Sequence, residues 1–361
     1  MKENMDILVS VLMCVYNTPA QYLQEAIDSI LGQTYENIEF VIVDDGSNRE
    51  ETLECLEKRA EEESRIKLIH NPNNIGLTGS LNVGLGECSG DYIARMDADD
   101  ISMSDRIEKQ VRYMEGTRDV ALLGSKISFI GSSSDANDVK TRRKKSDYDL
   151  YRIRALIEHP GPAHPSFMFR ASFLNDNSIR YDERIKKGQD YNIITKILGK
   201  NGKISTFDEP LLKYRVHSEQ ITATSNTEQL LYRSRTSYEF VKALFTSLSD
   251  AECAAVSTLG WYNDIKMMDE SEKNTKVPTE SREHLIKNRQ SLESSDVYIT
   301  ALKKMISEND KRQLFPPKPF KAEMCYRWWK KAVRMTKMRH DMWGMGVFTF
   351  ACYRFVICRR L

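Results

Sequence analysis

Four apolar runs, each followed by a polar turn and an amphipathic segment, occupy the first part of the chain and restrict its fold. The runs lie at residues 7–16, 38–43, 66–69 and 92–96 and are rich in Val, Leu and Ile. Strands that are buried on both faces of a parallel sheet have this composition. Amphipathic segments between such strands predict crossover helices. The order therefore predicts an α/β fold with an open, mostly parallel sheet.

Helical periodicity follows each run. Asn17-Thr18-Pro19 makes the first turn. We expect Thr18 to be the N-cap residue and Pro19 to stand at the first helical position, where its missing N–H does no harm. The apolar faces of the predicted helices lie within residues 22–31, 50–63, 81–85 and 106–114.

Two acidic clusters follow two of the predicted strands. Asp44 and Asp45 end the second run, and Asp97, Asp99 and Asp100 end the fourth. Carboxylates this close repel one another unless a cation or hydrogen-bond donors compensate them, and their oxygens suit Mg²⁺ or Mn²⁺. Because ligands of such sheets bind beyond the carboxyl ends of the strands, the two clusters predict one shared site. The alternative is a pair of solvated, Asp-rich turns.

Strand and helix signals continue to about residue 224. The polar segment 132–149 is expected to be a surface loop, or else a loop over a substrate cleft. Asp190 stands at the start of an apolar-periodic helix, where a carboxylate is also favoured by the helix dipole. Short strands are predicted at residues 167–169, 204–207 and 211–216.

Beyond residue 224 the strand signals stop and helices are predicted. A Pro-rich break at 315–319 separates these helices from a basic, aromatic segment. We expect three parts: an α/β domain at 1–224, a helical extension at 225–317, and a basic aromatic helical tail at 318–361.

Composition excludes several classes of protein. The 361 residues have a formal net charge of only +1, which argues against a general nucleic-acid binder. The seven cysteines are scattered without a Cys-x-x-Cys pair, so neither a zinc site nor a disulfide framework is indicated, and a reducing cytoplasm is expected. The first apolar run leads into a turn and a helix, which predicts a core strand and no signal peptide.

Several groups of residues, taken in order, resemble those of a known family. The chain resembles a family 2 glycosyltransferase of the GT-A fold, of the kind that builds bacterial cell-surface polysaccharides. The resemblance extends from about Leu8 to Ala223. The matching groups are Ser10–Asn17, Ser29–Thr34, Val43–Ser47, Asp97–Asp100, His164–Ser166, Gly188–Asp190 and Tyr214–Gln220.

The resemblance implies roles on the donor side. Tyr16 would lie against the nucleotide base, and Asp45 would hydrogen-bond that base. Asp97 would sit near the ribose and phosphates. Asp99 would bind the metal directly, and His217 would reach the metal or the diphosphate.

The resemblance also implies that Asp190 is the catalytic base. A base must take the proton of the acceptor hydroxyl as the new bond forms. Family members commonly carry Glu before this base, whereas Gln189 stands here. The change removes one charge beside Asp190 and leaves the carboxylate itself in place.

The predicted function is inverting, metal-dependent transfer of a sugar from a nucleotide-diphosphate sugar, expected to be UDP-linked, with Mn²⁺ or Mg²⁺ as cofactor. The expected acceptor is a saccharide or a lipid-linked saccharide. A sugar-nucleotide pyrophosphorylase is one alternative, although residues 16–19 offer no Gly-rich loop with a basic residue. A catalytically silent binding or regulatory protein with the same fold is another.

The tail at 318–361 suggests where the protein works. Lys and Arg alternate there with aromatic residues, among them Trp328, Trp329 and Trp343. Such segments lie on anionic membrane surfaces, so we expect a cytoplasmic protein attached peripherally to the inner face of the plasma membrane. No apolar run reaches the roughly 18–20 residues that span a bilayer. The alternative is that the tail packs as ordinary helices.

Overall fold

The computed structural model describes residues 7–131, 148–216, 226–259 and 295–339, together with 283–285, 287, 288 and 292. The chain divides into two compact units. The first contains residues 1–145 and 161–223, and the second contains 146–160 and 224–361. Residues 146–160 thus belong with the later helices. The three-part division at 224 and 317 stays a prediction.

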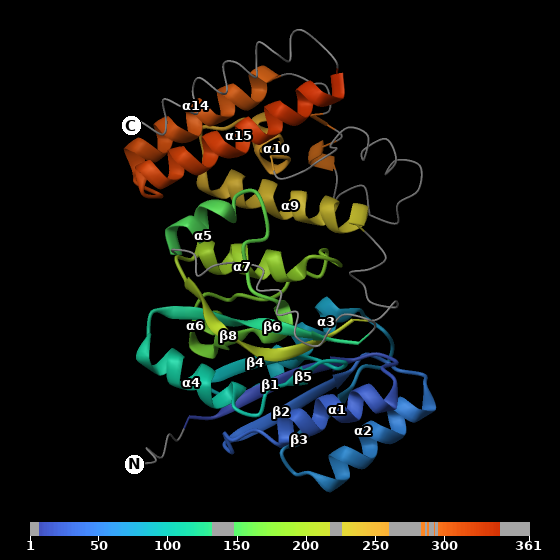
Figure 1. Ribbon diagram of the computed structural model, residues 1–361. Coiled ribbons are helices and arrows are strands. Elements are labelled where there is room, and N and C mark those ends of the chain that lie inside the picture. The colour runs from blue at the N-terminus through green and yellow to red at the C-terminus, as the bar shows by residue number, and fades with distance from the viewer. Residues whose placement is uncertain are drawn as a thin grey trace. The chain divides into compact units, whose positions relative to one another are not determined.

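An eight-stranded sheet, in the order β3-β2-β1-β4-β7-β6-β8-β5, forms the centre of the first unit (Figure 1). The pairs β1–β2, β1–β4, β2–β3 and β6–β8 are parallel, whereas β7 runs antiparallel to its two neighbours. This arrangement confirms the predicted mostly parallel α/β sheet. The strands are β1 (Val9–Val15), β2 (Ile38–Asp44), β3 (Ile66–His70), β4 (Tyr92–Asp97), β5 (Ile101–Ser102), β6 (Val120–Ile130), β7 (Met168–Arg170) and β8 (Lys203–Arg215).

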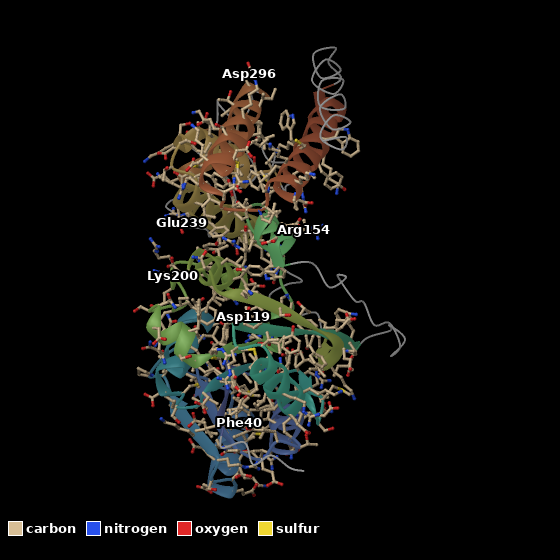
Figure 2. The ribbon with its side chains drawn as sticks, turned by 90° about the vertical axis from the view of Figure 1, so that its left-hand side faces the viewer. Phe40, Asp119, Arg154, Lys200, Glu239 and Asp296 are labelled. Atoms are coloured by element: carbon tan, nitrogen blue, oxygen red, sulfur yellow. The ribbon has the colours of Figure 1, made fainter. Side chains whose placement is uncertain are left out.

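Helices cover both faces of this sheet. Alternate residues of β1, Val9, Val11 and Met13, share one hydrophobic core with α1 and α4. On the other face, α3 packs on β1 and β2. Phe40 of β2, labelled in Figure 2, has no exposed surface. The helices of this unit are α1 (Ala20–Leu31), α2 (Glu50–Glu62), α3 (Leu77–Glu87), α4 (Arg106–Gly116), α6 (Ala171–Asp176) and α7 (Gln189–Gly199), with a short 3₁₀ turn, η1 (His164–Ser166).

Two local predictions about these elements are wrong, and one strand was missed. Helix α1 begins after Pro19, and Thr18 makes no side-chain cap; its carbonyl instead accepts from the Thr52 hydroxyl at 2.8 Å. Strand β6 was not predicted, because Gly124 and several polar residues interrupt its apolar pattern. Strand β8 is one long strand and not two, with a shift in its pairing with β6 near Pro210.

The second unit is helical, as predicted for the later part of the chain. Its core includes Phe245, Phe315 and Phe320, whose rings stack with centroids 5.2–6.2 Å apart. Trp328 is buried and stacks on Tyr298. None of the helices in the described residues is long and apolar enough to cross a membrane. The longer helices are α5 (Tyr148–Arg154), α9 (Asn226–Leu244), α10 (Asp250–Ser257), α14 (Ser295–Arg312) and α15 (Pro317–Arg339).

Gly84 allows α3 to approach the sheet closely. A Cβ atom at this position would lie 2.1 Å from Cδ1 of Leu12 and 3.2 Å from Cγ2 of Val43. Both of these residues are fully buried in the strands beneath. Gly86 lies two residues further along the same helix, and a Cβ there would meet nothing within 4 Å.

We therefore expect opposite effects from two alanine substitutions in α3. Gly84→Ala should destabilise the first unit by about 1–3 kcal/mol, because the added methyl group overpacks a filled core. Gly86→Ala should stabilise it by about 0.5–1 kcal/mol, because alanine favours the helix and meets no neighbour. Urea unfolding of both variants measures the difference, and equal stabilities would contradict the close approach at Gly84.

Candidate active site

The carboxyl ends of three neighbouring strands meet at one edge of the sheet. In the strand register, Val15 of β1 lies beside Asp44 of β2, and Cys14 lies beside Asp97 of β4. Tyr16, Asp45 and Asp97 therefore emerge at the same edge, as the order of strands predicts. Ligands of open α/β sheets bind at such an edge.

Asp45 organises the loop that precedes α3. Its carboxylate accepts hydrogen bonds from the backbone N–H of Ile75 and Gly76, each at 2.9 Å, and from Nδ2 of Asn71 at 3.0 Å. The loop also packs against Gly46, where a Cβ would lie 2.6 Å from the backbone of Asn73. Because an ionised carboxylate accepts about four hydrogen bonds, Asp45 retains capacity for one further donor.

The turn after β1 leaves Tyr16 exposed. Asn17 adopts a left-handed conformation with φ of 51°, which asparagine tolerates better than most residues. Its Oδ1 accepts from the backbone N–H groups of Asn48 and Arg49 at the start of α2. The Tyr16 side chain is 49% exposed, the highest value among the large hydrophobic residues of the described chain. An aromatic face is thus held in solvent close to Asp45.

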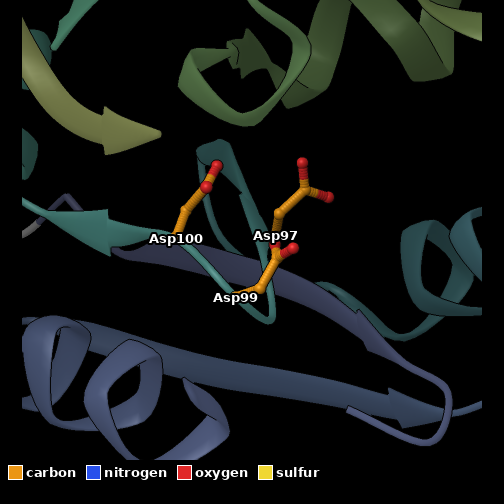
Figure 3. Close-up of side chains that lie close together, drawn as sticks. All are labelled: Asp97, Asp99 and Asp100. Atoms are coloured by element: carbon orange, nitrogen blue, oxygen red, sulfur yellow. The ribbon is translucent and has the colours of Figure 1, made fainter. Parts of the chain in front are cut away.

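The turn between β4 and β5 collects three carboxylates (Figure 3). One oxygen from each of Asp97, Asp99 and Asp100 lies within 4.8 Å of the others, a spacing that could hold a metal ion. Oδ1 of Asp100 accepts from the backbone N–H of Arg215 at 2.9 Å. Oδ2 of Asp100 is buried, and no donor in the described residues reaches it. A buried carboxylate oxygen without a partner is what a divalent cation would satisfy.

The carboxylates of this turn strongly influence one another. Burial raises the pKa of Asp97, the Arg95 guanidinium opposes that rise, and the charges of Asp99 and Asp190 add to it. Burial and the charges of Asp97 and Asp99 raise the pKa of Asp100 well above its ordinary value. A bound cation would reverse these shifts, because it favours the ionised forms.

Asp190 lies in the first turn of α7, beyond Gly188, which adopts φ of 77°. Its Oδ1 accepts from the backbone N–H of Tyr191 at 2.8 Å. Its charge acts on Asp97 and on the buried Tyr181, so it belongs to the same electrostatic environment as the acidic turn. Tyr181 in turn hydrogen-bonds Nε2 of His164 at 2.7 Å.

The structure thus groups Asp97 and Asp99 with Asp100, and it places Tyr16 and Asp45 on the same sheet edge. The Asp190 charge contributes to the raised pKa of Asp97. His217 lies outside the described residues, so its predicted contact with metal or diphosphate stays a prediction. The assigned roles of all six residues likewise stay predictions.

Two residues of this region were missed by the sequence argument. Arg95 is a fully buried arginine that pairs with Asp97. Its signal was a lone charge within the apolar run that forms β4. Asn71 holds both Asp45 and Ser80, and its signal was an Asn-rich turn that directly follows β3.

Comparisons with known protein sequences agree with this arrangement. The sequence model of glycosyl transferase family 2 matches residues 10–177. The chain is 35% identical over 227 residues to an uncharacterized glycosyltransferase, MJ1057, of Methanocaldococcus jannaschii, which covers 62% of this chain and 76% of the relative. It is 36% identical over 232 residues to an uncharacterized glycosyltransferase of Haemophilus influenzae, covering 62% of this chain and 69% of the relative.

A solved structure shares the fold. Residues 1–349 of S. aureus TarS, crystallised in complex with UDP-GlcNAc, superpose with a TM-score of 0.61 and 16% sequence identity. The match covers 93% of each chain. This similarity confirms the predicted GT-A architecture with its helical C-terminal region.

We expect binding of Mn²⁺ to the acidic turn to release protons. The raised pKa values of Asp97 and Asp100 keep part of these groups protonated above the ordinary carboxyl value of 3.8, whereas a bound cation requires the ionised form. The affinity for Mn²⁺ should therefore fall as the pH is lowered through this window. Isothermal titration in two buffers of different ionisation enthalpy measures the release, and identical binding enthalpies in both buffers would contradict it.

Proposed function

The chain belongs to glycosyl transferase family 2, and from this premise we propose that it transfers a sugar from a UDP-linked donor to an acceptor hydroxyl with inversion at the anomeric carbon. The observation that carries the proposal is the grouping of three carboxylates at the strand edge, beside Asp45 and within the electrostatic reach of Asp190. Family 2 membership establishes a glycosyltransferase. The UDP donor, the metal and the inversion are our proposal.

The donor would lie along the sheet edge. Tyr16 offers an exposed aromatic face for the base, and Asp45 has capacity for one N–H donor of that base. Asp97 would face the ribose and phosphates. The binding of UDP-GlcNAc by TarS, a protein of the same fold, supports a nucleotide-sugar donor for this chain.

The proposed cofactor is Mn²⁺ or Mg²⁺, held by Asp99 with the help of His217. When bound, such a cation would stabilise the charge that develops on the departing diphosphate. The three grouped carboxylates and the unpartnered oxygen of Asp100 fit a hard divalent cation. Asp97, paired with Arg95, keeps a positive group next to the cluster.

Asp190 would act as the base on the acceptor side. A single carboxylate suffices for direct inversion, since it needs only to remove the proton of the attacking hydroxyl. The backbone N–H of Tyr191 donates to the Asp190 carboxylate and orients it in the first turn of α7.

Two other functions are separated from this proposal by simple assays. A silent binding protein would bind UDP with Mn²⁺ without hydrolysing or transferring any donor sugar. A sugar-nucleotide pyrophosphorylase would consume a sugar phosphate and a nucleoside triphosphate. A panel of nucleotide sugars screened by thermal shift in Mn²⁺, followed by donor hydrolysis, tests all three.

Asp99→Ala should remove the dependence of donor binding on Mn²⁺. Loss of a directly coordinating carboxylate weakens the site, whereas the fold should persist because Asp99 is partly exposed at a turn. Titration with UDP, with and without Mn²⁺, measures the effect. Asp105→Ala, at another turn of the same unit, is the matched control. Unchanged Mn²⁺ dependence in Asp99→Ala would refute the role.

Asp190→Asn should lower the transfer rate by about 10²–10⁴-fold and leave UDP affinity close to that of the wild type, because only proton removal is lost. If Asp190 merely supports its helix, the variant should stay active and melt at a lower temperature. Steady-state kinetics and UDP titration measure the effect on transfer and binding, and thermal unfolding measures the effect on the helix.

We also propose that the acceptor is a saccharide or lipid-linked saccharide reached at a membrane surface. Helix α15 already uses Phe320 and Trp328 in the core of the second unit, so these residues do not serve a membrane. On the same helix, Tyr326 and Trp329 are only partly buried, and Lys330 lies 4.8 Å from the Tyr326 ring centroid. Residues 340–361 add further arginines and Trp343.

Flotation with anionic vesicles should therefore recover the full chain at low salt. A protein that ends at Arg339 keeps the core residues of α15 together with Tyr326, Trp329 and Lys330. It should float less than the full chain, because Trp343 and three arginines are lost. Neutral vesicles serve as the control. The membrane proposal fails if the full chain stays at the bottom of the gradient, or if both proteins float equally.

A further inference from the structure

Arg215, the last residue of β8, contacts two separate parts of the first unit, the acidic turn and α1. Its Nε donates to the backbone carbonyl of Asp99 at 2.7 Å, and its backbone N–H donates to the Asp100 carboxylate at 2.9 Å. Its guanidinium lies 4.3 Å from the ring centroid of Tyr22 and pairs with Glu25, both on α1. The Arg215 side chain is only 12% exposed.

The acidic turn is also held by the Arg95–Asp97 pair and by its short connection to β5. Within the turn, the N–H of Asp100 reaches the carbonyl of Asp97 only at 3.5 Å. Strand β5, which follows the turn, pairs with β8 through just Ile101 and Ser102. Repulsion among three carboxylates favours opening of the turn, so contacts that tie it to β8 and α1 oppose that opening.

We propose that Arg215 is a positioning residue, which locks the Asp97–Asp100 turn in its closed conformation before a cation binds, and that Glu25 anchors this lock to α1. The inference rests on the proposed function, since it concerns the same acidic turn. Neither Arg215 nor Glu25 is among the residues to which the family resemblance gives a role in the site.

The shape of the guanidinium explains why an arginine is required. A planar fork donates in two directions at once, here to the Asp99 carbonyl through Nε and to Glu25 through Nη2. A lysine ammonium is a point charge and cannot hold both partners in this geometry. The Glu25 carboxylate also neutralises Arg215, so the fork can sit beside the metal ligands without adding a net positive charge to the site.

A second set of contacts keeps α1 in register with the turn. The backbone N–H of Ser102 donates to Oγ of Ser29 at 3.0 Å, and Nε2 of Gln33 donates to the carbonyl of Met103 at 2.8 Å. Both acceptors and donors lie just after the turn or at the end of α1. The position of α1 is therefore fixed relative to β5, and Glu25 offers a rigid anchor for the fork.

Hydrogen exchange of the metal-free protein provides the first test. Arg215→Met should speed exchange in the peptide that covers residues 97–104 by about tenfold or more. Without the Arg215 contacts, less free energy is needed to open this turn locally. Peptides of β1 and β2 should be unchanged. Arg112→Met, which removes an exposed ion pair with Glu108 on α4, is the matched control and should leave residues 97–104 unchanged.

Mn²⁺ binding and kinetics provide the second test. Groups that orient metal ligands typically affect metal affinity by about 10–100-fold, and we expect this rise in the Mn²⁺ dissociation constant for Arg215→Met. Excess Mn²⁺ should restore most of the transfer rate, a recovery that a general loss of stability would not give. Arg215→Lys should recover little of the affinity.

Glu25→Ala keeps the proposal testable if Arg215→Met does not fold. The Glu25 side chain is 37% exposed, so its loss should leave the fold intact while loosening the lock. The two substitutions should be non-additive, as expected for residues in direct contact. Exchange at residues 97–104 within twofold of the wild type in the folded variants would overturn the inference. A wild type that binds no Mn²⁺ would instead refute the metal in the proposed function, while the exchange result still decides the role of Arg215.

Discussion

Repulsion among the carboxylates of Asp97, Asp99 and Asp100 is the constraint around which the first unit is built. Strand β4 delivers these groups to one sheet edge, and two arginine side chains contact the turn that holds them. Arg95 pairs with Asp97 from within β4, while Arg215 approaches from β8. Ion pairs that are exposed on a protein surface each stabilise the fold by only about 0–1 kcal/mol. Arg95 and Arg215 are instead largely shielded from solvent. Removing either arginine would leave a carboxylate without its partner, which lowers the stability of the fold by more than the loss of a surface pair.

Behind the acidic turn, another buried arginine, Arg106, connects this sheet edge to α4 and η1. Nη2 of Arg106 donates to the Arg95 carbonyl at 2.8 Å, and its Nε donates to Gln110 at 3.0 Å. Gln110 continues the connection to the carbonyl of Ser166 in η1. Burial and the neighbouring charge of Arg95 lower the pKa of Arg106 to about 9, which still leaves it charged at neutral pH. The His164–Ser166 segment is therefore connected, through Gln110 and Arg106, to the strand that leads into the acidic turn.

Features of the fold and of the site could be predicted where they depend on residues that are near one another in the sequence, and were missed where they depend on distant ones. Strands β1 to β4 were predicted within two residues at their ends, because β1, β2 and β4 are largely buried apolar runs and the edge strand β3 is a short apolar stretch between polar turns. Strand β6 was missed because its partners β7 and β8 lie far along the chain, and its polar residues are tolerated only in that context. Asp97, Asp99 and Asp100 could be grouped because they stand within four positions at the end of one predicted strand. The arginines could not, since a lone charge within a strand or at its end does not reveal which carboxylate it will meet.

The segment 146–160 has a consequence for the order in which the protein can fold during synthesis. It belongs to the helical unit, where Glu158 receives both terminal nitrogens of Arg327 at 2.6 and 2.7 Å. Arg327 follows Glu158 by 169 residues, so at a ribosomal rate of about 5–20 residues per second the partner arrives about 10–30 s later. Until α9 and the later helices are made, the apolar side chains of Ile153 and Leu156, which are fully buried in the finished protein, have no helical core to enter. The nascent chain thus carries an exposed apolar segment through the whole period in which its sheet is completed, and this is the stage at which a chaperone has most to protect.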